Sequence, residues 1–303
     1  MKIVFFGTPE FAAETLESLV QTPEINILAV VSQPDKPVGR KKTLTAPPVK
    51  VTAERFNLPV IQPKNKRELA EKVKNLKADF FVVIAFGMIF PPEVLKIPKF
   101  GAINVHASLL PKYRGASPIQ ESLLHGDKET GISIMQMDDQ LDHGPVYLLK
   151  KMPIEETDNL ETLTKKLSKL SADITPLALQ DIKQGFLSAP IPQNHEKATF
   201  CTKIEKEDGL IDWNCSAEEI KNLIRAYNPW PSAYTLIDGK KLKILSAETD
   251  SITTKPEKYE IENGHLKIGT SKGRIIPKTV QLEGKNQTDI KSFLNGSKNL
   301  LPL

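Results

Sequence analysis

Short apolar runs alternate with helical segments through the first half of the chain, and this alternation restricts the fold more than any other feature of the sequence. Residues 2–6, 25–31 and 80–85 are rich in β-formers, whereas residues 10–19 and 48–57 space their apolar side chains as a helix does. Strands joined through helices pair in parallel, because the crossover returns the chain to the same end of the sheet. The pattern therefore predicts an α/β fold in which helices cover both faces of a mostly parallel sheet.

The last third of the chain has a different pattern. Turn signals of the Asp-Gly and Asn-Gly type, at residues 238–239 and 263–264, separate short β runs, which predicts antiparallel hairpins and a small barrel. A segment with two prolines and weak periodicity precedes this region. The full length of 303 residues also exceeds the ~150 residues of one ordinary domain. We therefore predict an N-terminal domain at residues 1–188, a linker at 189–205 and a C-terminal domain at 206–303.

Composition excludes several classes of protein. Hydrophobic residues make up 40% and charged residues 26% of the chain, which is typical of globular proteins, and the net charge of +4 does not by itself indicate a nucleic-acid partner. Cys201 and Cys215 are too few for a disulfide framework, and the five histidines lack the H-E-x-x-H spacing of a zinc site. We expect no metal, no membrane segment and a cytoplasmic location.

The first turn argues against a dinucleotide site. Gly7 ends the first strand, and we expect Thr8 to cap the following helix with Pro9 at its first position. A dinucleotide fingerprint needs three glycines in the pattern G-x-G-x-x-G, and a proline here removes a backbone N–H that a pyrophosphate would use. An ordinary strand-to-helix turn is therefore favoured.

A candidate reaction centre lies where the strand at residues 102–105 ends. Asn104 and His106 are two residues apart, so they share one face of a strand. An amide can stabilise a developing oxyanion, and an imidazole can transfer protons near neutral pH. Asp142 follows the strand at residues 131–137 and offers a carboxylate to orient the imidazole. From spacing alone, a hydrogen-bonded core pair and an ordinary turn aspartate would explain the same residues.

A second candidate surface is basic. The segment 36–50 contains no acidic residue, three prolines and one glycine, so we expect an exposed, flexible loop. Such a loop can follow phosphates, although a solvated surface loop is the commoner fate of a charge run. Its cationic residues are Lys36, Arg40, Lys41, Lys42 and Lys50.

Several motifs together resemble one known family. The opening MKIVFFGTPEFA, the basic stretch QPDKPVGRKK, the segments FGAINVHASLLPKYRGASPIQ and GISIMQMDDQLDHGPV, and the later NPWPSAYT resemble the methionyl-tRNA formyltransferases. Asn-x-His with Ser-Leu-Leu-Pro and a later Asp is specific to the wider group of 10-formyltetrahydrofolate-dependent formyltransferases. The resemblance covers nearly the whole chain, and it implies a Rossmann-like N-terminal domain and an OB-like C-terminal barrel that contacts tRNA.

The resemblance also implies roles for individual residues. Asn104, His106 and Asp142 fall on the catalytic residues of the family. The donor would be 10-formyltetrahydrofolate, and the acceptor the α-amine of methionine on initiator tRNA, as translation initiation requires. No metal would take part, and the protein would act as a monomer. Folate contacts fall on Ser108, Leu109, Leu110 and Pro111, and Arg40 falls in the loop that enters the tRNA acceptor end. From their charge we expect Lys36, Lys41 and Lys42 to contact the tRNA as well.

The implied mechanism centres on the tetrahedral intermediate. Asn104 and His106 would donate hydrogen bonds to the developing oxyanion, while Asp142 would orient His106 for proton transfer. The rivals with the same chemistry are formyltransferases for glycinamide ribonucleotide or an amino sugar nucleotide, and a formyltetrahydrofolate hydrolase. The basic segment argues against the small acceptors. A non-catalytic RNA-binding module is the alternative from another class, and Asn104, His106 and Asp142 argue against it.

Overall fold

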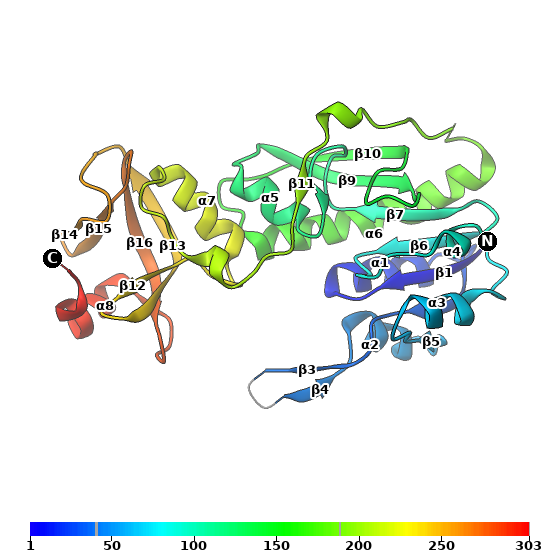
Figure 1. Cartoon of the computed structure of the whole chain (residues 1–303), viewed down its shortest axis with the longest axis horizontal. Helices are drawn as coiled ribbons and strands as arrows, with labels where there is room; N and C mark the ends of the chain where they lie inside the picture. Colours follow the sequence, from blue (N-terminus) through cyan, green and yellow to red (C-terminus); the bar gives the residue numbers. More distant parts are fainter. Residues whose placement is uncertain (40–41, 188, 303) are drawn as a thin grey trace. The chain divides into compact units, whose positions relative to one another are not determined.

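The structure is a computed structural model that describes residues 1–39, 42–187 and 189–302 (Figure 1). The chain divides into two compact units, and each unit draws on several stretches of sequence. The first unit consists of Met1–Gly115, Thr130–Met152 and Thr164–Phe200, and the second of Ala116–Glu129, Pro153–Leu163 and Cys201–Leu303.

A seven-stranded sheet forms the centre of the first unit, in the order β10-β9-β7-β6-β1-β2-β5. The five strands from β5 to β7 pair in parallel, and β9 pairs with β7 in the antiparallel sense. The predicted mostly parallel sheet is thus confirmed. The strands are β1 (Lys2–Gly7), β2 (Asn26–Val31), β5 (Val60–Ile61), β6 (Phe80–Ile84), β7 (Ala102–His106), β9 (Glu129–Gln136) and β10 (Val146–Pro153).

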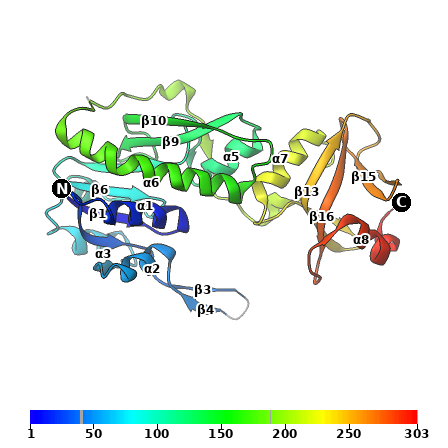
Figure 2. The same cartoon turned by 180° about the vertical axis from the view of Figure 1, so that it is seen from behind.

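Helices cover both faces of this sheet, as the apolar runs predict. Val4 and Phe6 pack on one face with apolar side chains of α3 and α4. The opposite face carries α1 and α6, which are joined by a hydrogen bond of 2.8 Å between the hydroxyls of Thr15 and Ser171; Figure 2 shows these two helices in front of the strands. The helices are α1 (Glu10–Val20), α2 (Pro48–Arg55), α3 (Lys66–Val73), α4 (Pro92–Leu95) and α6 (Leu160–Gln184).

Two local predictions in this unit were wrong. Thr8 does not cap α1; Pro9 occupies the cap position without a side-chain bond, and the Thr8 hydroxyl donates to the carbonyl of Phe86 at 3.1 Å instead. The helix expected at residues 48–57 ends at Arg55, because Asn57 adopts a left-handed conformation with φ of 54°.

The basic segment contains a hairpin rather than an irregular loop. β3 (Lys36–Val38) pairs with β4 (Thr43–Thr45) in an antiparallel ladder, and all six residues are exposed. The hairpin extends away from the sheet of the first unit (Figure 1). Arg40 and Lys41 lie outside the described residues.

The second unit contains an antiparallel sheet that curves into a half-barrel, which confirms the predicted C-terminal architecture. Its order is β12-β13-β16-β15-β14, with β17 paired to β16, and both predicted hairpins are present. The strands are β12 (Tyr234–Ile237), β13 (Lys240–Asp250), β14 (Tyr259–Glu262), β15 (His265–Gly269), β16 (Arg274–Leu282) and β17 (Thr288–Asp289).

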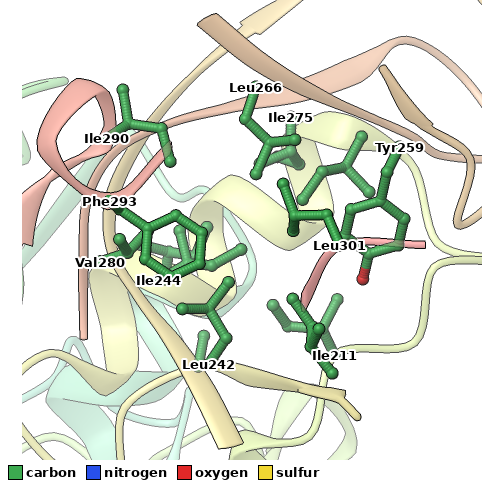
Figure 3. Close-up of a cluster of buried hydrophobic side chains, with 14 of the residues drawn as sticks. Ile211, Leu242, Ile244, Tyr259, Leu266, Ile275, Val280, Ile290, Phe293 and Leu301 are labelled. Atoms are coloured by element: carbon green, nitrogen blue, oxygen red, sulfur yellow. The ribbon is translucent and has the colours of Figure 1, made fainter. Parts of the chain in front are cut away.

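Helices α7 and α8 contribute to the core of this half-barrel. Apolar side chains from α8, such as Phe293, meet those of the strands, including Leu242, Ile244 and Val280 (Figure 3). Ser216 and Glu219 form the capping box that the sequence predicts at the start of α7. The helices of the second unit are α5 (Pro118–Leu124), α7 (Ala217–Tyr227) and α8 (Ile290–Ser297).

The remaining elements are short. A two-stranded sheet joins β8 (Arg114–Gly115) to β11 (Phe200–Cys201), and single 3-10 turns occur at His195–Lys197, Glu207–Gly209 and Lys298–Leu300.

None of the helices in the described part of the chain combines the length and the apolar character that crossing a bilayer requires.

Candidate active site

The candidate site lies at the carboxyl end of β7. His106 is the last residue of this strand and is buried, and Asn104 is half-buried on the same face. The parallel register pairs Asn104 with Val83 of β6, so the carboxyl ends of these neighbouring strands lie at one edge of the sheet. Ligands of open α/β sheets bind at this edge.

Asp142 reaches these two residues from the loop between β9 and β10. The Asn104 side-chain amide donates to Asp142 Oδ1 at 3.0 Å, and the backbone N–H of Gly115 donates to Oδ2 at 2.8 Å. Oδ2 also lies 3.7 Å from His106 Nδ1. The structure therefore brings together the three side chains that the sequence singled out, although 38 positions separate Asn104 from Asp142.

The imidazole of His106 is anchored by a backbone carbonyl. Its Nε2 lies 2.9 Å from the carbonyl oxygen of Tyr113, and since a carbonyl only accepts, Nε2 carries a hydrogen. The other ring nitrogen, Nδ1, faces Asp142 at a separation longer than a hydrogen bond. A neutral ring with this tautomer presents the lone pair of Nδ1 toward the carboxylate side of the site.

The segment Ser108–Pro111 follows directly and is held by buried polar contacts. The Ser133 hydroxyl of β9 donates to the carbonyl of Ser108 at 2.5 Å and accepts from the backbone N–H of Leu110 at 3.0 Å. Ser108 and Leu110 are buried, while Leu109 and Pro111 are half-buried. Sequence reasoning missed Ser133; a polar residue inside the apolar strand 132–137 was the available signal.

Two further residues near Asp142 were also missed. Gln193 donates to the backbone carbonyls of Asp142, at 2.9 Å, and of Gly144, at 2.7 Å. Its own amide oxygen accepts from Arg114 Nε and Nη2, at 3.2 and 2.7 Å. Burial lowers the pKa of the Arg114 guanidinium, against the opposing attraction of Asp142 and Asp138. Gln193 falls in the stretch predicted to be a linker, where no periodicity marked it.

A pair of histidines lies beside the same loop. The rings of His143 and His195 stack with centroids 4.0 Å apart, and His143 Nδ1 lies 2.6 Å from Asp138 Oδ2. Burial, together with the nearby His143 and the cationic Arg114, lowers the pKa of His195. These contacts stabilise the loop that carries Asp142 and contribute no group to the cluster around His106.

The basic segment divides into paired and exposed cations. Lys50 donates to both carboxylate oxygens of Asp35, at 3.0 and 2.9 Å, and this interaction raises the pKa of Lys50. Lys50 is therefore unsuited to binding phosphate, although the sequence placed it among the cations of the basic segment. Lys36 and Lys42 are exposed. Arg40 and Lys41 lie outside the described residues, so their assignment rests on the sequence alone.

Among residues 1–39, 42–187 and 189–302, no group of three or more His, Cys, Asp or Glu side chains is arranged to hold a metal ion. What the described site offers is an amide, an imidazole and a carboxylate beside a buried loop at a sheet edge. These groups are suited to transfer of an acyl-type unit through a tetrahedral intermediate.

Fold and site together define a one-carbon transferase of the formyl transferase class. The sequence profile of formyl transferase matches residues 1–179, and that of the formyl transferase C-terminal domain matches residues 203–298. A solved N-formyltransferase from Helicobacter canadensis, in complex with folinic acid and dTDP-3-aminofucose, shares this fold with a TM-score of 0.69. Its sequence is 20% identical, and the match covers 91% of this chain and 98% of that one.

Curated relatives give the finer assignment. The chain is 44% identical over 309 residues to the methionyl-tRNA formyltransferase of Caldicellulosiruptor saccharolyticus, covering 98% of this chain and 97% of the relative. It is 42% identical over 298 residues to that of Thermodesulfovibrio yellowstonii, covering 98% and 96%. The chain belongs to the methionyl-tRNA formyltransferase family, which confirms the resemblance found in its motifs.

Proposed function

We propose that this protein is an enzyme that transfers the formyl group of 10-formyltetrahydrofolate to the α-amine of methionine on initiator tRNA, for translation initiation. Family membership supports the reaction and the identity of both substrates. The observation that supports the location of the reaction is the contact of Asn104, His106 and Asp142 at the carboxyl end of β7. We assign the catalytic roles to these three residues.

In this reaction the amine nitrogen forms a bond to the formyl carbon, and the bond from that carbon to folate N10 breaks. One proton moves from the amine to N10, so atoms and charge balance. An α-amine has a pKa near ~8, and an adjacent ester lowers it, so much of the acceptor is neutral at pH 7. The main barrier is therefore the negative charge that develops on the formyl oxygen.

Asn104 and His106 have different roles, and His106 is not the oxyanion donor expected from the sequence, because its Nε2 hydrogen is held by the Tyr113 carbonyl. Asn104 donates one amide hydrogen to Asp142, and we assign the second hydrogen of the same amide to the developing oxyanion. His106 keeps its Nε2 hydrogen on the Tyr113 carbonyl, so Nδ1 is the atom that takes the amine proton and passes it on. The Asp142 carboxylate, 3.7 Å from Nδ1, stabilises the positive charge that the ring then carries.

The remaining assignments concern the substrates and their domains. We propose that Ser108, Leu109, Leu110 and Pro111 contact the folate, and that residues 1–188 form the catalytic domain. Residues 189–205 connect it to a tRNA-contacting domain at 206–303. The protein acts in the cytoplasm as a monomer. The tRNA contacts of the first domain come from Lys36, Arg40, Lys41 and Lys42.

Replacement of His106 or Asp142 by alanine tests the assignment. Formyl transfer from a labelled donor to methionyl-initiator tRNA is expected to fall by about 100- to 1000-fold in kcat, as when one oxyanion or proton-transfer group is lost. Circular dichroism melting checks that each variant folds. His125→Ala removes an exposed imidazole from the end of α5 and is expected to keep full activity. Wild-type turnover by either active-site variant refutes the assignment.

The acceptor is tested separately with the unmodified protein. Methionyl-initiator tRNA, methionyl-elongator tRNA and a ribonucleotide amine are compared at equal concentration. We expect rapid transfer only to the initiator tRNA. Faster transfer to the ribonucleotide amine, or release of formate without an acceptor, would instead indicate one of the rival folate-dependent reactions.

A further inference from the structure

The loop that carries Asp142 has an uncommon backbone conformation at that residue. Asp142 has a φ of 48°, in the left-handed region that non-glycine residues rarely occupy. Such a backbone persists only where surrounding contacts determine it. The direction of the Asp142 carboxylate toward Asn104 and His106 therefore depends on what fixes this backbone.

Gln193 supplies these contacts. Its side chain is buried at 8% exposure, and its amide nitrogen donates to the carbonyls of Asp142 and Gly144. The two amide hydrogens thus bind the carbonyls of the residues immediately before and after His143. The amide oxygen accepts the two hydrogen bonds from Arg114, so the whole amide group is engaged with protein atoms. Gln193 has the contacts of a residue that fixes a loop rather than one that binds substrate.

Arg114 completes a closed set of contacts around Asp142. Its side chain is 4% exposed and holds the amide of Gln193 in one orientation. The next residue, Gly115, donates its backbone N–H to the Asp142 carboxylate. The two residues of β8 therefore fix two parts of Asp142. Gly115 binds its carboxylate directly, and Arg114 acts on its backbone carbonyl through Gln193.

We infer that Gln193 is a positioning residue for formyl transfer, which acts by fixing the backbone of Asp142 and thereby the direction of its carboxylate. This inference rests on the proposed function, because it presupposes the role of Asp142. A displacement of about 1 Å at a reacting group can reduce a rate by about 100-fold. Loss of Gln193 should accordingly reduce kcat without weakening substrate binding.

Two substitutions separate the donor from the acceptor contacts of Gln193. Gln193→Met keeps the length of the side chain and removes all four hydrogen bonds. Gln193→Glu keeps oxygens for Arg114 and removes the donors to the Asp142 and Gly144 carbonyls. We expect both variants to lose about 10- to 100-fold in kcat, with KM for folate and for tRNA unchanged within about twofold. Gln180→Met makes the same change at a half-buried position of α6, where the amide contacts Glu24, and is expected to leave kcat unchanged.

A double-mutant cycle shows whether Gln193 acts through Asp142. In an Asp142→Ala background, Gln193→Met should lower kcat by less than about threefold, because the group that it positions is gone. An equal loss in both backgrounds, or wild-type kcat in both Gln193 variants, overturns the inference. A fully active Asp142→Ala variant refutes the proposed catalytic site itself, so the two failures are distinguishable. Thermal melting of each full-length variant accompanies the kinetics.

Discussion

Two backbone carbonyls limit what the side chains around Asp142 can do. The carbonyl of Tyr113 holds Nε2 of His106 and so decides which ring nitrogen is left for the proton transfer that we propose. The carbonyl of Gln136 lies where a side chain at residue 144 would begin, since a Cβ on Gly144 would lie 1.9 Å from it. At this scale the site depends on backbone atoms as much as on the three side chains to which we assign the chemistry.

Gly144→Ala is therefore expected to disturb the reaction centre. A Cβ cannot approach a carbonyl oxygen this closely, so the loop after Asp142 must move by more than an ångström, and the Gln193 contact to the Gly144 carbonyl is strained. We expect kcat to fall by about 10- to 100-fold in the transfer assay. Gly296→Ala in α8, where nothing lies within 4 Å of the new methyl, is the control and should keep wild-type kcat. Unchanged kcat in Gly144→Ala would contradict this account.

At the scale of elements, one buried arginine joins three strands of the half-barrel. Arg274 begins β16 and is 2% exposed, and its guanidinium donates to Asp250 at the end of β13 and to Glu260 and Glu262 of β14. The hydrogen bond from Arg274 holds the pKa of Asp250 below its ordinary value of 3.8. Because the folded pKa is depressed, the stabilisation is complete above the ordinary pKa and is lost as the pH falls through the folded value.

Asp250→Asn is expected to destabilise the protein by about 2 kcal/mol at pH 7, as for a lost hydrogen bond between charged groups. The difference from the unmodified protein should shrink as the pH falls below about 4, because the Asp250 carboxyl then takes up a proton in the unfolded chain before it does in the native protein. Urea unfolding of the full chain at pH 7 and between pH 4 and 3 measures this. Glu248→Gln disrupts the exposed pair with Lys278 and should have no measurable effect. A difference that is constant with pH would exclude the ion pair as its cause.

Elements with strong local signals were predictable from the sequence, and elements that depend on remote contacts were not. The hairpin turn at Asp238-Gly239 and the capping box at Ser216 are encoded within a few residues, and both are present. The β3–β4 hairpin was not predicted, because its strands are three residues long, include Pro37 and have no buried side to impose alternation. Backbone pairing alone defines it.

The same distinction applies to the candidate site. Asn104 and His106 stand out because one strand carries both, and Asp142 stands out because it follows the strand predicted at residues 131–137. The family motif includes all three. Gln193 is 51 positions from Asp142 and touches only its backbone, so neither spacing nor residue type reveals the contact. The tautomer of His106 likewise depends on a carbonyl that the fold, and no local pattern, brings to Nε2.

At the scale of the whole molecule, the placement of charge matters more than its sum. The net charge of +4 is small for 303 residues, yet the segment 36–50 has no acidic residue. Asp35 neutralises Lys50 from outside this segment, which leaves the cations at positions 36 and 40–42. A local group of cations binds phosphates by releasing the counterions of the nucleic acid, so it makes affinity depend on salt.

Arg40→Ala and Lys42→Gln test this role of the hairpin segment. We expect KM for methionyl-initiator tRNA to rise about 5- to 10-fold at moderate salt, as each removed phosphate contact costs about 1 kcal/mol, and the salt slope of log Kd to fall by about 1 per variant. KM for the folate donor should stay within about twofold, since the proposed folate contacts at Ser108–Pro111 lie outside this segment. Lys96→Gln, an exposed lysine just after α4, should leave both slope and KM unchanged. A parallel rise in the folate KM, or an unaltered salt slope, would show that the segment serves the fold of the first unit rather than the tRNA.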